Sequence, residues 1–417
     1  MPNYHIWTIG CQMNKAESEQ LGSLFEHIGY RATDAAENAD VIVLNSCVVR
    51  QSAENRVVNK IWALQPFARA HPDITLAVTG CLVNSDTARL RKDFPYVDYF
   101  FKPGDYPPWL EKPAAVATLP QHPSPTAYVP IIQGCNNFCT YCIVPYRRGR
   151  EVSRPVAEII CEVKGLVGRG VKEVTLLGQN VDSYGHDLPD KPDLADLLQE
   201  FNAIDGLARI RFLTNHPKDM SVKLIDAIAR LDKLCEQISL PVQSGSDDIL
   251  KLMRRGYTAA QYRQLVKRIR DSVPGVALST DVIVGFPSET ESQFQQTVNL
   301  LSELRFGTVH VAAYSPRAGT AASRELEDDI PLAVKKERLN TIEQLQEKIA
   351  AEINEKLLGN TMEILVESRV KGKWQGRTRT GKLAFFRDSR DYLGQLASIR
   401  IDKTSPWSLQ GTVIKTK

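Results

Sequence analysis

The stretch Cys135-Asn-Asn-Phe-Cys139-Thr-Tyr-Cys142 decides how the rest of the sequence is interpreted. It directly follows the apolar segment Val129–Gln133, which is typical of a buried strand. The C-x3-C-x2-C spacing places three thiolates on one short loop. Three thiolates can hold three corners of a 4Fe–4S cube and leave one iron without a protein ligand. Reductive cleavage of S-adenosylmethionine requires such an open iron, because the amino and carboxylate groups of that cofactor can chelate it.

A structural zinc site or a chance cluster is the alternative for this loop. Structural zinc normally takes four ligands, often as paired C-x2-C knuckles. The nearest further cysteine, Cys161, lies in an apparent helix. The sequence therefore favours an iron–sulfur cluster, with Cys135, Cys139 and Cys142 as metal ligands and candidate catalytic residues.

The loop opens a long segment, residues 121–353, in which predicted strands and helices alternate. Six strands with helical crossovers predict an α/β fold, an open and partial (β/α)6 barrel, because a full eight-fold barrel usually needs more chain. The cysteine loop would then lie at the carboxyl end of the first strand, where active sites of such folds are found. The predicted strands are Val129–Gln133, Glu173–Leu177, Arg209–Thr214, Gln237–Val242, Ser279–Gly285 and Thr308–Tyr314, and a long helix is predicted from Pro331 to Leu358.

Residues 1–117 also alternate strand and helix, which predicts a separate α/β domain with a parallel sheet. A proline-rich stretch around residues 102–130 is expected to be a linker. The predicted strands are Tyr4–Ile9, Val41–Leu44 and Ile74–Thr79, and the predicted helices are Lys15–Ile28, Ser52–Arg69 and one after Ser85.

Cys11, Cys47 and Cys81 each lie just past one of these three strands. Loops after parallel strands converge on one edge of a sheet, so three thiolates could meet there and hold a second 4Fe–4S cluster. The alternative is three separately buried cysteines, since a buried cysteine at a strand end is common. Cys161 and Cys235 show no pattern and are expected to be small buried hydrophobes.

From residue 354 to the end the chain changes character, with short strands and polar breaks that predict a small five-strand barrel. This segment holds 13 Lys+Arg against 6 Asp+Glu, a balance of +7, whereas the whole chain carries only +3. Cations and aromatic rings on a small barrel suit RNA contact. The candidate RNA-binding residues are Lys371, Lys373, Trp374, Arg377 and Arg379. Of the adjacent Phe385 and Phe386, one should point into the barrel.

The composition, 43% hydrophobic and 24% charged, is that of a folded globular protein rather than a disordered one. No apolar run is long enough for a membrane span, and the start shows no pattern of a signal peptide. We therefore expect a cytoplasmic protein without membrane contact. Cysteines in such a protein more often bind metal or act in catalysis than form disulfides.

Over nearly the whole chain the sequence resembles the methylthiotransferase family of radical-SAM enzymes. The resemblance is carried by GCQMN, NSCVVR, TGC, GCNNFCTYCIVPY with the following RGRE, LLGQNVDSYG, LPVQSGSD, TDVIVGFP, YSPR and GRTRT. Gly10–Asn14 and the Cys135 loop are closest to the MiaB-type branch, which makes 2-methylthio-N6-isopentenyladenosine beside the tRNA anticodon.

The resemblance implies two 4Fe–4S clusters and two molecules of S-adenosylmethionine per turnover. The cluster at Cys135, Cys139 and Cys142 would bind S-adenosylmethionine and generate a 5′-deoxyadenosyl radical, and the auxiliary cluster at the other three cysteines would carry the sulfur. The last segment resembles a TRAM domain, an RNA-binding barrel. The implied partners are a tRNA anticodon stem-loop, an electron donor and a sulfur donor of unknown identity. We expect a monomer.

Four further residues are candidates for the S-adenosylmethionine or substrate pocket. Gly178 and Gln179 end the second strand, where the corresponding radical-SAM motif contacts the cofactor's amino group; a turn is the alternative. Gln243 ends the fourth strand, and Asp281 is a charge inside an apolar strand, which usually needs a partner. Arg147, Arg148 and Arg150 follow the cysteine loop and suit either phosphate contact or a solvated surface.

Two other functions remain open from the sequence. The same chemistry could act on threonylcarbamoyl-adenosine of tRNA or on an aspartate of a ribosomal protein. A non-catalytic iron–sulfur RNA-binding protein is the second alternative, although a purely structural cluster would normally have four protein ligands.

Overall fold

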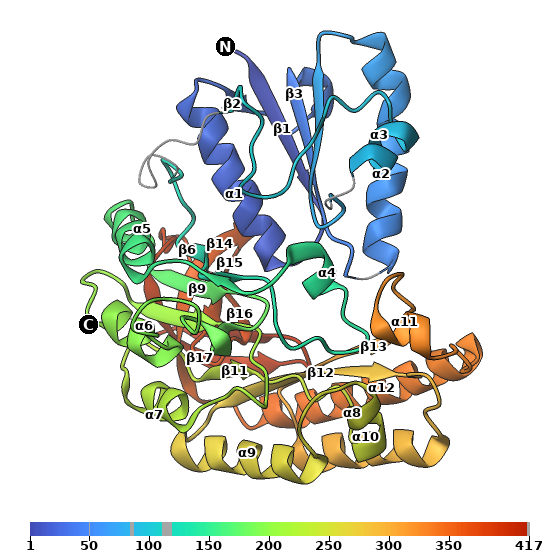
Figure 1. Cartoon of the computed structure of the whole chain (residues 1–417). Helices are drawn as coiled ribbons and strands as arrows, with labels where there is room; N and C mark the ends of the chain where they lie inside the picture. Colours follow the sequence, from blue (N-terminus) through green and yellow to red (C-terminus); the bar gives the residue numbers. More distant parts are fainter. Residues whose placement is uncertain (50, 84–86, 111–118, 415–417) are drawn as a thin grey trace.

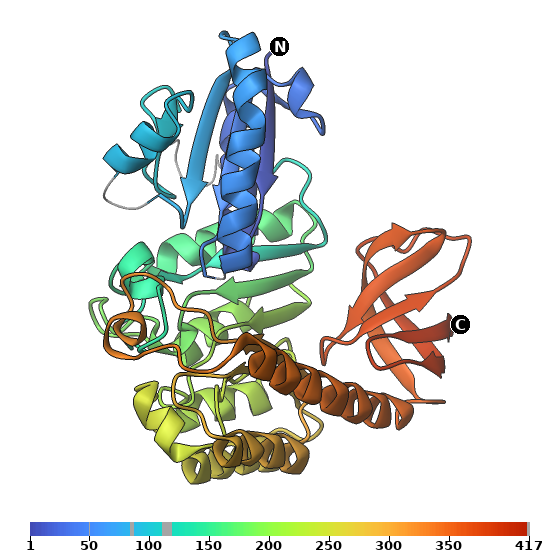
Figure 2. The ribbon, with the colours of Figure 1, turned by 90° about the vertical axis from the view of Figure 1, so that its right-hand side faces the viewer.

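The strands of the computed structural model fall into three groups along the chain: an amino-terminal sheet, a central sheet and a carboxyl-terminal barrel (Figure 1). The structure describes residues 1–49, 51–83, 87–110 and 119–414. The amino-terminal sheet stands above the central one, and the barrel lies to one side of it (Figure 2).

The amino-terminal sheet is parallel, in the order β2-β1-β3-β4-β5. Its central strand β3 is buried along its whole length. Because successive side chains of a strand face opposite ways, Val41 and Val43 pack with α1, and Ile42 and Leu44 pack with α2. The elements are β1 (Asn3–Thr8), α1 (Gln12–His27), β2 (Arg31–Ala32), η1 (Ala36–Asn38), β3 (Val41–Ser46), α2 (Gln51–Ala70), β4 (Thr75–Gly80), α3 (Thr87–Asp93) and β5 (Tyr99–Phe100).

Six parallel strands form the central sheet in two runs, β6-β9-β10 and β11-β12-β13. A parallel bridge between Ile210 and Leu234 links the runs. The strands are β6 (Thr126–Pro130), β9 (Glu173–Leu177), β10 (Arg209–Phe212), β11 (Gln237–Ser239), β12 (Ala277–Val284) and β13 (Thr308–Ala313), and a short hairpin pairs β7 (Ile132–Gln133) with β8 (Val152–Ser153). The predicted open, six-stranded (β/α) barrel is confirmed.

Helices cover the outer face of these strands and close one hydrophobic core. Thr258 and Thr290 cap α9 and α10 by accepting the backbone N–H three residues on, a common helix start. The helices are α4 (Val144–Arg148), α5 (Val156–Gly168), η3 (Val181–Ser183), α6 (Leu194–Asn202), α7 (Val222–Arg230), α8 (Asp247–Leu252), α9 (Ala259–Ser272), α10 (Glu291–Leu304), α11 (Ala321–Glu325) and α12 (Leu332–Glu355).

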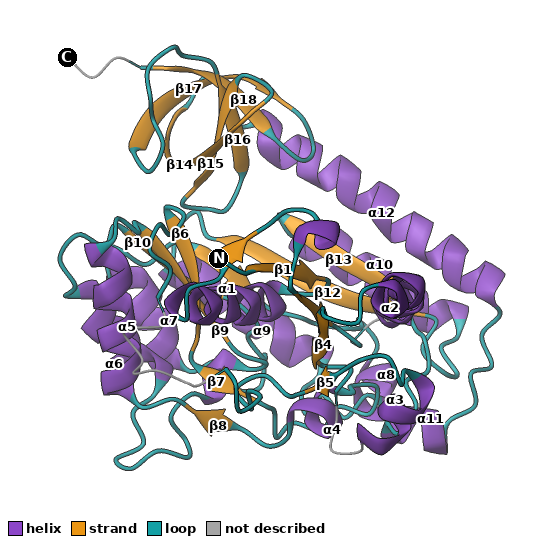
Figure 3. Cartoon of the chain, turned by 90° about the horizontal axis from the view of Figure 1, so that it is seen from above, coloured by secondary structure: helices purple, strands orange, loops and turns teal. Residues whose placement is uncertain are grey.

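Helix α12 leads from the central sheet to a closed five-stranded barrel (Figures 2 and 3). Its strands are β14 (Thr361–Val370), β15 (Lys373–Thr378), β16 (Leu383–Phe386), β17 (Leu396–Thr404) and β18 (Leu409–Val413). As expected, one of two adjacent phenylalanines points inward: Phe386 is 2% exposed and belongs to the barrel core, while Phe385 is partly exposed.

The barrel docks on the amino-terminal ends of the core strands through buried arginines. Arg209, the first residue of β10, is fully buried and donates to the Glu363 carboxylate at 2.8 Å and to the Arg377 carbonyl at 2.7 Å. Arg211 donates to the carbonyls of Thr378 and Arg379. The barrel therefore lies at the end of the sheet opposite to the cysteine loop.

All nine strands predicted for residues 1–353 are present, with ends shifted by a few residues, whereas the two-residue strands β2, β5 and β8 were not predicted. The predicted boundary at residue 117 lies outside the described residues, and the division at 117, 121 and 354 stays a prediction. Among the described residues, none of the helices is both long and apolar enough to cross a membrane.

Candidate iron–sulfur and cofactor site

The cysteine loop starts at a glycine that no other residue could replace without a shift. Gly134 has φ +84, and a Cβ there would lie 2.0 Å from the Arg150 carbonyl oxygen. The chain then winds tightly, with Phe138 at φ +47 and the Cys142 N–H donating to the Cys139 carbonyl at 3.0 Å. This close packing brings three cysteines to one side of the strand end.

Two loops clamp this turn through its asparagines. Asn137 donates to the Asp219 carboxylate at 3.0 Å and accepts from Lys218 Nζ at 2.6 Å. Asn136 donates from its backbone and its side chain to Glu151, at 3.0 and 3.1 Å. The two asparagines inside the motif therefore hold the loop, while its cysteines remain available as ligands.

A buried arginine lies directly against one of the cysteines. Arg255, 4% exposed, donates from Nη1 to Cys139 Sγ at 3.2 Å and from Nη2 to the Pro241 carbonyl at 2.9 Å. Burial raises the pKa of Cys135 to about 11 and that of Cys142 to about 12, so in the metal-free chain both are thiols at neutral pH. Metal binding would displace those protons, as is usual for thiolate ligands.

Unpaired buried polar atoms gather at the carboxyl ends of the neighbouring strands. Asn180 Oδ1, Asn215 Oδ1 and His216 Nε2 have no hydrogen-bond partner among the described residues, and each residue is at most 6% exposed. Buried polar groups are rarely left unpaired. Left-handed backbone at Thr214 (φ +71) and Gln243 (φ +72) accompanies them, and such conformations concentrate at functional sites. These atoms fit the polar groups of a bound cofactor or substrate.

The His216 ring has a defined tautomer. The Lys218 backbone N–H donates to Nδ1 at 3.2 Å, so the ring proton is on Nε2, the atom without a partner. Burial, with the Arg255 charge, lowers the pKa of His216 to about 3, so the ring is neutral. Close by, burial raises the pKa of Asp182 to about 7, although Asn215 and the His216 backbone N–H donate to its carboxylate. His216 thus has a buried N–H donor without a partner among the described residues.

The four cofactor candidates from the sequence lie at the same end of the sheet. Gln179 accepts from the Gly134 N–H at 2.6 Å, so it positions the cysteine loop. Gly178 packs on Ile132, whose Cγ2 lies 2.4 Å from where a Cβ would be. Gln243 is buried and its backbone pairs with that of Asp281, which is only partly buried.

The second set of cysteines converges from three loops. A Cβ on Gly10, which precedes Cys11, would lie 2.7 Å from Cys47 Cβ. The Cys81 N–H donates to the carbonyl of Ser46, the residue before Cys47, at 2.8 Å. Burial raises the pKa of Cys47 to about 11, and its neighbours Cys81 and Cys11 raise it further.

An arginine of the core reaches this second triad. Arg148, from α4, donates from Nε to Cys81 Sγ at 3.2 Å and pairs through Nη1 with Glu17 of α1 at 2.5 Å. Its side chain is 6% exposed. The phosphate or surface role considered for Arg148 is therefore wrong: this residue joins the core to the auxiliary cysteines.

Each triad thus has three converging cysteines and one arginine N–H directed at a sulfur, a donor set that suits an anionic iron–sulfur cluster. In the described part of the chain, no three His, Cys, Asp or Glu side chains close around a single ion position. The fit to a cluster depends on the convergence of the loops and on the soft thiolate ligands.

The five candidate RNA-binding residues of the barrel differ in how far their side chains are exposed. Lys371 and Arg377 are exposed and Lys373 is partly exposed, where RNA could reach them. Trp374 is 6% exposed and donates to the Asp388 and Arg390 carbonyls, and Arg379 is held by Glu236 at 2.7 Å. The stacking role predicted for Trp374 and the RNA contact predicted for Arg379 are therefore corrected: one is core and the other is part of the docking interface.

The two cysteines outside the triads differ in their solvent exposure. Cys235 is 1% exposed, as expected, but Cys161 is exposed on α5, so its predicted burial is wrong. The sequence reasoning also missed Arg255, Asp219 and the pair Asn215–His216. The asparagine–histidine pair follows a predicted strand and could have been found from that position, but nothing in the spacing indicates Arg255.

An open (β/α) barrel with a three-cysteine loop after its first strand defines a radical-SAM enzyme. Residues 129–301 match the Radical SAM superfamily, residues 3–102 match the Uncharacterized protein family UPF0004, and residues 355–414 match the TRAM domain. The chain belongs to the family of the tRNA-2-methylthio-N(6)-dimethylallyladenosine synthases. It is 55% identical to the enzyme of that name from Dehalococcoides mccartyi, over 100% of this chain and 99% of the relative. The Chloroflexus aurantiacus enzyme is 48% identical, over 98% and 91%.

Solved structures share the fold at low sequence identity. The radical S-adenosylmethionine methyltransferase TsrM from Kitasatospora setae, determined with cobalamin and a 4Fe–4S cluster, superposes with a TM-score of 0.53 at 12% identity and covers 78% of this chain and 74% of its own. The cobalamin-dependent radical enzyme OxsB gives 0.52 at 11% identity, covering 82% and 56%. These likenesses concern the fold alone.

Proposed function

We propose that this enzyme transfers a methylthio group to carbon 2 of N6-isopentenyladenosine beside the tRNA anticodon, giving 2-methylthio-N6-isopentenyladenosine. The observation that carries the proposal is the pair of cysteine triads, each with an arginine on one sulfur, on a chain whose relatives bear that enzyme's name over their whole length. A tRNA substrate would place the enzyme in the cytoplasm.

Cys135, Cys139 and Cys142 would hold a 4Fe–4S cluster with one open iron, and Asn180, Asn215 and His216 would contact S-adenosylmethionine or the target base. Cys11, Cys47 and Cys81 would hold the second cluster. When bound, the clusters and S-adenosylmethionine supply the radical and the sulfur chemistry. The protein's own part is positional: Asn137 and Gln179 fix the first loop, and Arg148 fixes the second triad against the core.

Lys371, Lys373 and Arg377 are the barrel residues that we propose for RNA contact, because their side chains are at least partly exposed. The electron donor and the sulfur donor would be separate proteins or small molecules, and the chain would act as a monomer. Threonylcarbamoyl-adenosine or a ribosomal-protein aspartate as acceptor has no observation in its favour.

The test is expression in a bacterium that lacks an enzyme of this type, followed by mass spectrometry of digested tRNA. We expect 2-methylthio-N6-isopentenyladenosine with the unmodified chain and none after Cys→Ala at any of the six triad cysteines. Cys161→Ala, a change of the same size at an exposed position, should retain the product. Product from a triad variant, or only the precursor from the unmodified chain, would contradict the proposal.

A further inference from the structure

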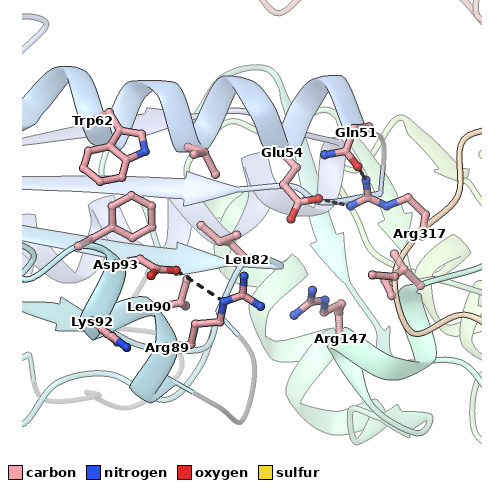
Figure 4. Close-up of a pocket in the computed structure, with 14 residues that line it drawn as sticks. Gln51, Glu54, Trp62, Leu82, Arg89, Leu90, Lys92, Asp93, Arg147 and Arg317 are labelled. Atoms are coloured by element: carbon pink, nitrogen blue, oxygen red, sulfur yellow. Dashed lines mark hydrogen bonds and ion pairs between the residues drawn. The ribbon is translucent and has the colours of Figure 1, made fainter.

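A cavity of about 860 Å³ lies between the amino-terminal sheet and the core. We refer to it as the Trp62 cavity. One wall comes from α2 and α3, and the other from α4 and the loop after β13 (Figure 4). Leu82, next to Cys81, and Ile143, next to Cys142, both line it. The cavity is therefore lined by the sequence neighbour of one cysteine from each triad.

Four cations line this cavity against two carboxylates. They are Arg89, Lys92, Arg147 and Arg317, with Glu54 and Asp93. Arg317 is committed to the wall, because it donates to the Val48 carbonyl at 2.5 Å and pairs with Glu54. Among the described residues, Arg147 makes no side-chain hydrogen bond or ion pair, and Arg89 pairs with Asp93 at 3.6 Å. Arg89 and Arg147 reach into the space from α3 and α4 (Figure 4).

The other notable feature is an exposed aromatic ring. Trp62 is 47% exposed on α2 and meets the Phe94 ring edge-on at 5.1 Å. The Tyr96 ring lies 6.4 Å from the indole as well, and the indole lines the cavity (Figure 4). An indole ring and arginine side chains that line one cavity are a combination that binds single-stranded nucleic acid, by stacking on a base and by phosphate contact.

We propose that the Trp62 cavity binds nucleotides of the RNA loop adjacent to the adenosine being modified. Trp62 stacks on a base, and Arg89, Lys92 and Arg147 contact phosphates. The inference rests on the proposed function, because it takes the anticodon loop as the ligand. The position argues for this occupant: a base that enters between the two triads carries its neighbours past Leu82 and Ile143, which lead into this cavity.

The test is the affinity of the iron-loaded full chain for a fluorescently labelled anticodon stem-loop that carries N6-isopentenyladenosine, measured by anisotropy without reductant, so that no turnover occurs. Trp62→Ala should weaken binding by about five-fold or more, and Trp62→Phe by less, since phenylalanine keeps a stacking face. Tryptophan fluorescence quenching by the RNA should diminish in Trp62→Phe. Unchanged iron content and melting temperature would show that the variants fold.

The cations have a matched control. Arg89 pairs with Asp93 and Arg230 with Asp226, both four residues apart on a helix and both about 80% exposed, but Arg230 lies on α7, away from the cavity. We expect Arg89→Ala to reduce the slope of log affinity against log salt by about 0.7, and Arg230→Ala to leave it unchanged.

The outcomes separate this inference from the proposed function. If the unmodified chain binds the stem-loop and the Trp62 and Arg89 variants bind it as tightly as Arg230→Ala does, the inference is wrong, whatever product forms. If those variants bind normally but make less product in cells, the cavity serves a different partner, and the inference is also wrong. If the variants lose affinity while the unmodified chain makes no methylthiolated product, the cavity assignment stands and the proposed reaction falls.

Discussion

At the scale of single residues, two arginines from the core reach the two cysteine triads. Arg255 lies against Cys139, and Arg148 lies against Cys81 of the other sheet. An N–H donor to a cluster sulfur offsets the negative charge that reduction adds, and hydrogen bonds to the sulfurs are one of the factors that set the potential of such clusters. With the proposed clusters bound, Arg148 and Arg255 would therefore tune their potentials as well as hold the fold.

We expect Arg148→Ala to lower the reduction potential of the auxiliary cluster proposed at Cys11, Cys47 and Cys81 and to loosen α1 from the core, because both the N–H to Cys81 and the pair with Glu17 are lost. Arg148→Lys keeps a charge for Glu17 but not the planar fork that serves both partners at once. The measurement is a redox titration followed by electron paramagnetic resonance, with iron content alongside. Arg150→Ala, two residues further at an exposed position, is the control; an identical titration for Arg148→Ala and Arg150→Ala would contradict this role.

The sequence predicted both cysteine triads because ligand spacing and strand ends are local signals, and the structure brings the cysteines of each triad together. The sequence did not predict the contacts of side chains whose partners are distant in the chain. Arg148 and Arg379 lie among other basic residues in the sequence, yet each pairs with a carboxylate more than a hundred residues away. From the sequence, Trp374 could stack on a base or belong to the core. The closed barrel shows that its indole lies inside.

At the scale of elements, strand ends and the turns that follow them build the site. The alternation of strands and helices predicted nine strands, because buried parallel strands give clear apolar runs. The short hairpin β7–β8 gives no such signal, yet it carries the cysteine loop at one end and Arg150 near the other. The geometry of this hairpin depends on the close approach of Gly134 to the Arg150 carbonyl, which the amino-acid composition does not reveal.

Gly134→Ala should disrupt this turn by collision as well as by strain. Its φ of +84 is unfavourable for alanine, and the added Cβ would meet the Arg150 carbonyl at 2.0 Å. Gly149 has nearly the same φ, +81, but nothing within 4 Å of a Cβ. Gly149→Ala should cost about 1–3 kcal/mol from conformation alone, because φ +81 with ψ −162 is a combination that essentially only glycine adopts, and Gly134→Ala clearly more. Thermal melting and the iron bound per chain test this; equal effects of the two substitutions would show that the close approach is unimportant.

At the scale of the whole molecule, the barrel and the core form one unit through buried charge. Glu173, at the start of β9, pairs with Arg211 at 2.8 Å, and Arg209 beside it reaches into the barrel. Such pairs add little net stability, but removing one partner leaves a buried charge uncompensated. The docking of the barrel is therefore sensitive to single substitutions.

Arg209→Ala should cost about 3–5 kcal/mol of docking free energy. We expect a lower melting temperature and faster proteolysis between α12 and β14. Arg400→Ala removes an exposed pair with Asp402 on the barrel surface, where a loss of about 0–1 kcal/mol is expected. If the two variants melted and were cleaved alike, the buried arginine would not be what fastens the barrel.

The loop of Cys135, Cys139 and Cys142 lies at the carboxyl ends of the core strands, and the barrel lies at their amino ends. The eight residues of β12 alone span about 26 Å, so an RNA that touches both ends must be at least that long. Such an RNA binds as a two-point ligand, whose second contact is made at high effective concentration. An oligonucleotide that carries the right base but is too short to reach the barrel loses this advantage. With the RNA contacts proposed above, the enzyme would discriminate among chemically identical adenosines by the length of the RNA that carries them.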